Sequence, residues 1–93
     1  MSPEDKAEMR AKALLHYTES AQETAMLRDQ ISESGDFYIQ VGEQLKNDPY
    51  TYLSKQYVFA PQAEIEKLVR VWMDAADETE RLKQKAISYG ASL

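Results

Sequence analysis

The stretch of residues 65–89, IEKLVRVWMDAADETERLKQKAISY, decides the fold class of this chain. Its larger or apolar positions recur at alternating steps of three and four residues, which is the spacing along one face of an α-helix. These positions are Ile65, Leu68, Val69, Trp72, Ala75 or Ala76, Thr79, Leu82, Ala86 and Tyr89. Pro61 precedes the stretch and Gly90 follows it, and both residue types are typical of helix boundaries. We therefore predict one helix over residues 61–89.

The N-terminal half carries a second helical pattern. Ser2 can cap a helix whose first residue is Pro3, because a proline at that position needs no N–H partner. Large or apolar positions then recur at helical spacing; they are Leu14, Tyr17, Ala21, Thr24, Leu27, Ile31, Tyr38, Val41 and Leu45. Gly35 interrupts this pattern and permits two interpretations.

In the favoured interpretation, Gly35 ends or kinks a first helix, and Asp36 caps a second one. This predicts separate helices over residues 3–34 and 36–46. In the alternative, one helix continues to about Lys46, and Gly35 and Gly42 are small residues where a neighbour packs closely.

The tripeptide Asn47-Asp48-Pro49 marks the clearest boundary in the chain. Asp48 can cap a new helix beginning at Pro49, because a residue before proline is disfavoured in the helical region. We predict a short connector helix over residues 49–58. The predicted fold is all-α: one domain over residues 1–93, arranged as an antiparallel helical hairpin or small helical bundle with a Pro-bounded connector.

The length of the chain favours self-association. A protein of 93 residues buries only about 60–65% of the surface of its unfolded chain, so its own core is thin. A lone hairpin would leave four large apolar residues of the last helix partly exposed, namely Val71, Trp72, Met73 and Ile87. Association of copies into a bundle would cover them. We expect a homodimer, a higher homo-oligomer, or an obligate protein partner.

Composition excludes several function classes. The chain has no cysteine and a single histidine, His16, so we expect no metal site and no cofactor. Eleven basic residues against sixteen acidic ones give a net charge of −5, which argues against nucleic-acid binding. No apolar run could span a membrane or form a secretion signal, so we expect a cytoplasmic protein. Because no catalytic motif is present, we expect no catalytic residues and no enzyme activity.

Aromatic residues are concentrated in the connector. Four of them, Tyr50, Tyr52, Tyr57 and Phe59, fall within ten residues, and none is required to form a turn. They either seal the end of the helical bundle or bind another protein, because tyrosine and phenylalanine are enriched in interface cores. Trp72 is the fifth candidate interaction residue.

Two short segments resemble type III secretion needle subunits. The first is Asn47-Asp48-Pro49 with Leu53 and Gln56 after it, which is similar to the turn between their helices. The second, residues 69–74 with the sequence VRVWMD, is similar to a segment of their second helix. The resemblance implies a small helical hairpin that polymerises. Pro61 departs from it, because those subunits continue a helix there.

The sequence thus predicts a non-enzymatic, oligomeric helical protein that binds another protein, as an adaptor, chaperone-like accessory factor or inhibitor. One alternative is a self-polymerising structural subunit. A second is an oligomer that binds a small anionic ligand through Arg28, Lys46 or Lys55 beside tyrosines.

Overall fold

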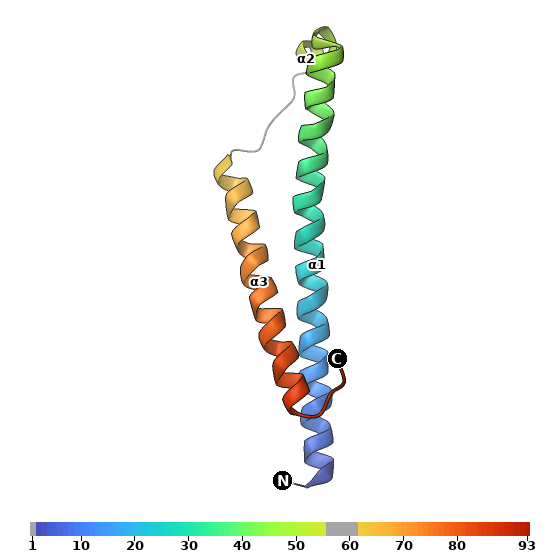
Figure 1. Cartoon of the computed structure of the whole chain (residues 1–93), viewed down its shortest axis with the longest axis vertical. Coiled ribbons are helices and arrows are strands. Elements are labelled where there is room, and N and C mark those ends of the chain that lie inside the picture. The colour runs from blue at the N-terminus through green and yellow to red at the C-terminus, as the bar shows by residue number, and fades with distance from the viewer. Residues whose placement is uncertain (1, 56–61) are drawn as a thin grey trace.

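The computed structural model describes residues 2–55 and 62–93, and the regular structure within them is entirely α-helical. Three helices follow one another: α1 (Pro3–Asn47), α2 (Pro49–Lys55) and α3 (Gln62–Ser88) (Figure 1). The predicted all-α fold class is therefore confirmed. The helix predicted over residues 61–89 matches α3 closely, and the described part of the connector helix is α2.

The beginning of α1 has the predicted cap. The Ser2 side chain accepts a hydrogen bond from the Asp5 amide at 3.2 Å, and Pro3 is the first helical residue. Glu4 and Asp5 place negative charge at the positive end of the helix dipole. These contacts satisfy backbone donors that would otherwise lack a partner in the first turn.

The predicted break at Gly35 is wrong, because α1 is one continuous helix from Pro3 to Asn47. Gly35 does not adopt the left-handed conformation of a helix cap; among the described glycines only Gly90 has a positive φ. A glycine inside a helix costs about 0.5–1 kcal/mol, a penalty small enough for the flanking helical pattern to offset. A β-carbon added at Gly35 or Gly42 would meet nothing within 4 Å, so neither glycine makes room for a packed neighbour in the single chain.

Proline ends α1 where the sequence predicts. Asp48, the residue before Pro49, has φ −152° and ψ 76°, outside the helical region. Its amide still donates to the Gln44 carbonyl at 2.8 Å and closes the last turn of α1. Its carboxylate then accepts a hydrogen bond from the Thr51 amide at 3.2 Å and caps α2. One aspartate therefore ends one helix and begins the next.

Gly90 ends α3, as predicted, with φ 96°. The Gly90 amide donates to the Ile87 carbonyl at 2.9 Å, and the Ala91 amide donates to the Ala86 carbonyl at 3.1 Å. This pair of bonds is a Schellman motif, which requires a left-handed residue and so favours glycine. The motif turns the chain back toward Arg10 of α1.

The helix α3 runs antiparallel to α1 and lies against its middle, so that α1 extends past α3 at both ends (Figure 1). The molecule measures 71 × 21 × 14 Å, which is one helix thick. Its radius of gyration of 20.6 Å greatly exceeds the ~12 Å of a compact domain of this length. So extended a shape does not establish the predicted hairpin or bundle. Self-association also stays a prediction.

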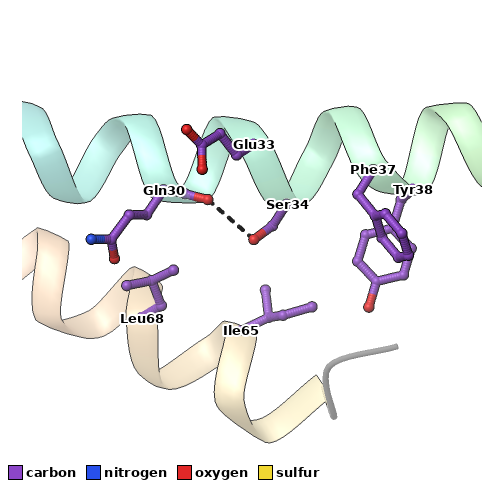
Figure 2. A pocket seen from close by; sticks show the side chains of 7 residues that line it. All are labelled: Gln30, Glu33, Ser34, Phe37, Tyr38, Ile65 and Leu68. Carbon is purple, nitrogen blue, oxygen red and sulfur yellow. Dashed lines mark hydrogen bonds between the residues drawn. The ribbon is translucent and has the colours of Figure 1, made fainter. Parts of the chain in front are cut away.

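The core between α1 and α3 is thin. Among the described residues only Ala13, Val41 and Ala86 are buried, and no large side chain is fully buried. Alanines allow the two helices to approach closely near the end of α3, where Ala86 is completely buried. The helices diverge toward the beginning of α3, where larger side chains such as Ile65 and Phe37 separate them (Figures 1 and 2).

A cluster of three hydroxyl groups lies in the middle of this core. Thr79 Oγ1 of α3 lies 2.7 Å from Ser20 Oγ and 2.9 Å from Thr24 Oγ1, both on α1. The Thr24 hydroxyl is also 2.9 Å from the Ser20 carbonyl, and the Thr79 hydroxyl 2.8 Å from the Ala75 carbonyl. The two hydroxyl contacts of Thr79 join α3 to α1, and they place Thr79 opposite Ser20 and Thr24.

Candidate protein-binding surface

The aromatic residues predicted to bind a partner lie at the far end of the molecule. On α2, Tyr50 is 84% exposed and Leu53 is 75% exposed, while Tyr52 is half-buried. Tyr57 and Phe59 lie outside the described residues. We call Tyr50, Tyr52 and Leu53 the α2 patch.

Trp72 is half-buried between α1 and α3, and it is not part of the α2 patch. The Arg28 guanidinium lies over its indole ring, 5.9 Å from the ring centroid, in a cation–π arrangement. At 1.5 Å per residue, α1 separates Arg28 from Asn47 by about 28 Å. Trp72 therefore does not share one surface with Tyr50 and Tyr52 of the α2 patch. Arg28 and Lys46 are almost equally far apart, so within one chain they do not share a site; the predicted anion site between copies stays a prediction.

Apolar side chains of α3 remain partly exposed, as the sequence predicts. Met73 is 52% exposed, and Val71 and Ile87 are exposed to a similar degree. Sequence reasoning missed Leu15, Met26 and Ile39 on α1, which are exposed apolar residues away from α3. The signal for them was present, because each falls off the apolar stripe of the helix and so cannot face the core.

An open groove lies where α1 and α3 diverge (Figure 2). Its volume is about 470 Å³. Ile65 and Leu68 of α3 point into it, and Phe37 and Tyr38 of α1 border its wider end, with their ring centroids 5.9 Å apart in an edge-to-face arrangement. Glu33 supplies the one carboxylate among its lining residues. Ile65, Leu68 and the two aromatic rings form the apolar part of the lining, which suits an apolar side chain.

One broad side of the helix pair carries more charged residues than this groove does. A shallow depression there is bordered mainly by charged or polar residues: His16, Glu19, Ser20, Glu23, Glu78, Arg81, Leu82 and Lys85. Arg81 Nε donates to Glu78 Oε2 at 2.8 Å, and a second bond joins the same two groups. This hydrogen bonding lowers the pKa of Glu78 and raises the pKa of Arg81. We call this surface the charged side.

The cap of α2 predicts a pH dependence. Hydrogen bonds from the Thr51 hydroxyl and amide lower the pKa of Asp48 below its ordinary value of 3.8. A carboxylate with a lowered pKa in the folded state stabilises that state above its unfolded pKa, and the stabilisation is lost as pH falls through the folded pKa. We expect the hydrogen-exchange protection of the Thr51 amide to decrease as pH falls below about 3.8, after correction for intrinsic exchange.

Two substitutions separate the charge of Asp48 from its capping role. Asn also caps helices well, so D48N should retain protection of Thr51 and lose its pH dependence. D48A should lose protection at every pH. Identical pH profiles for the wild type and D48N would contradict this role of the carboxylate.

Within residues 2–55 and 62–93, no group of three or more His, Asp or Glu side chains is placed to hold a metal ion. No helix in the same part of the chain is long and apolar enough to cross a membrane.

No protein-family model matches the chain, and no curated protein or solved structure is similar to it at a significant level.

Proposed function

We propose that this protein is a non-enzymatic helical protein that acts as an oligomer and binds another protein. The observation that carries the proposal is the thin core, because only Ala13, Val41 and Ala86 are buried among the described residues. Large apolar residues are exposed on all three helices instead. Exposed apolar surface of this extent is typical of proteins that complete their packing with a partner.

The antiparallel pair of α1 and α3 is proposed to persist in solution as a hairpin. The hydroxyl cluster and the close alanine packing near the end of α3 support a defined register. Further helices, from other copies of the chain, would convert the hairpin into a bundle and cover the residual apolar surface.

The α2 patch is the proposed contact for the second protein. Tyr50 and Leu53 contribute little to packing within the chain, because most of each side chain is exposed. Tyrosine offers a large contact area together with a hydroxyl that can hydrogen bond, which makes it a frequent anchor residue in interfaces.

The test is affinity purification of the tagged chain from its native host after mild cross-linking, followed by mass spectrometry. We expect a defined partner that the Y50A/L53A variant captures at least about tenfold less well, since truncated anchor residues commonly cost more than 1 kcal/mol. L15A serves as the matched control, because Leu15 is exposed on α1 away from α2. Equal capture by wild type and Y50A/L53A would remove the α2 patch from the proposal, and failure to capture any protein would contradict the function.

A polymerising structural subunit is the second candidate, and the overhang of α1 favours it. Because α1 extends past α3 at both ends, each end offers helix surface that α3 does not cover. Contacts between unlike ends would be heterologous and would produce open filaments. Light scattering distinguishes the candidates, because the mass of a filament rises continuously with concentration, whereas a closed oligomer reaches a fixed mass.

A further inference from the structure

One broad side of the helix pair, opposite the charged side, is mainly apolar. Arg28, Ile31, Val69 and Trp72 line one cavity of about 180 Å³, which places Arg28 and Val69 on the same side. Residues at seven-residue steps lie on nearly the same side of a helix. Seven-residue steps lead from Arg28 to Ala21 and Leu14 on α1, and from Val69 to Ala76 on α3. Met73 and Ile87 lie beside these positions on the surface of α3. We call the apolar residues of this side the Val69 face: Leu14, Ala21, Val69, Met73, Ala76 and Ile87.

The Val69 face is incompletely covered within one chain. Leu14, Ala21, Val69 and Ala76 are half-buried because they border the α1–α3 core, whereas Met73 is largely exposed. Glu66 and Glu80 also lie on this face, because each is seven residues from Met73. Two basic residues, Arg28 and Lys83, share the face with them. Their aliphatic stems can cover apolar surface while their charged ends reach water at its rim.

The exposed area of the chain leaves room for a partner to cover part of it. The chain exposes 7207 Å². A compact monomer of 10.7 kDa exposes about 5,500 Å², so the excess is roughly 1,700 Å² per chain. A stable interface buries about 800 Å² on each partner, and obligate homodimers bury more. The excess is therefore large enough for a homodimer interface.

The distribution of large and small residues on the Val69 face favours a second copy as that partner. Three larger residues of this face, Val69, Met73 and Ile87, are on α3, whereas α1 contributes one large residue, Leu14, and the small residues Ala21 and Gly35. A two-fold axis would place α3 of each copy against α1 of the other, so that large residues meet small ones twice. The charged side offers a poorer fit, because Leu82 is the one apolar residue among those that border its depression, and burying the ionised residues around it would cost desolvation energy.

We infer that a second copy of this chain packs on the Val69 face and completes a two-fold symmetric four-helix bundle. The inference deepens the proposed function and rests on its oligomeric part. It leaves the groove and the α2 patch outside the dimer interface, where a different protein can reach them.

Sedimentation equilibrium over a range of concentrations tests this inference. We expect wild type to approach twice the chain mass of 10.7 kDa. M73E places a charge from each copy in the interface and should raise the dissociation constant at least about tenfold. M26E is the matched control, because Met26 is 65% exposed and lies seven residues from Glu19 and Glu33, away from the Val69 face. M26E should leave the dissociation constant within about twofold of the wild-type value.

Far-UV circular dichroism accompanies each variant. Met73 contributes little to the core of a single chain, so M73E should retain the helical signal; where it does not, I87E provides the same test. A monomeric wild type, or equal weakening by M73E and M26E, would overturn the inference. A monomer that still captures a partner through the α2 patch would leave the protein-binding function standing, whereas a dimer that captures nothing would contradict that function alone.

Discussion

Replacing Trp72 by alanine is expected to lower the free energy of unfolding by about 2–3 kcal/mol. A fully buried tryptophan loses about 3–5 kcal/mol on this change, and Trp72 is only half-buried. The loss nevertheless removes the largest side chain between α1 and α3, together with the Arg28 contact over its ring. Since small domains are commonly stable by only 5–15 kcal/mol, a protein with so thin a core should unfold at a markedly lower denaturant concentration.

Urea titration followed by far-UV circular dichroism measures this effect, because W72A removes the only tryptophan and its fluorescence. W72F is the control that retains an aromatic ring, and we expect it to recover more than half of the loss. The chain concentration must be the same for every variant, because association of folded copies adds to the apparent stability.

The position of Trp72 beside the Val69 face gives the experiment a second readout. If the W72A monomer unfolds at the same urea concentration as the wild-type monomer and the variant loses only its association, Trp72 acts in the interface between copies. If stability falls in a monomeric background such as M73E, Trp72 packs between α1 and α3. An unchanged midpoint with unchanged association would contradict both roles.

The helix boundaries were predictable because they depend on local chemistry. Pro3, Pro49 and Gly90 restrict the backbone at their own positions, and Ser2 and Asp48 supply side-chain oxygens to amides three residues ahead. Such interactions are encoded within a few residues of sequence. They form without contacts to residues far away in the sequence.

Gly35 shows where local reasoning fails. A glycine after a polar stretch has the signature of a helix end, but its intrinsic cost is only about 0.5–1 kcal/mol. The helix can continue through it because the apolar pattern before Gly35 resumes in register at Tyr38 and Val41, and Val41 is buried. The low helix propensity of Gly35 was outweighed by the helical pattern of apolar residues on both sides of it.

The candidate site was predictable by residue type and not by position. The sequence predicts Tyr50, Tyr52 and Trp72 as interaction residues, but the distance between Trp72 and the two tyrosines depends on how far α1 continues. Once α1 is continuous, Trp72 lies in the middle of the helix pair and the α2 patch at its end. The pairing of α1 with α3 likewise depends on contacts between residues far apart in the chain.

The hydroxyl cluster leads to a second prediction about stability. Replacing Thr79 alone by valine should destabilise the protein by about 1 kcal/mol, because Ser20 and Thr24 lose their partner on α3. The triple variant S20A/T24V/T79V should instead be as stable as wild type, or about 1 kcal/mol more stable. An apolar contact that replaces every polar partner leaves no half-buried hydroxyl unsatisfied.

The same triple variant should lose specificity of register. The apolar positions of α1 and α3 repeat at nearly regular intervals, so shifted pairings bury similar surface, and the hydroxyl cluster is the contact that distinguishes them. Because the chain has no cysteine, spin labels can be placed at A11C on α1 and S88C on α3, both exposed positions. We expect one narrow distance distribution for wild type and a broader one for the triple variant. A narrow distribution in both, with T79V as stable as wild type, would mean that packing of the apolar residues alone sets the register.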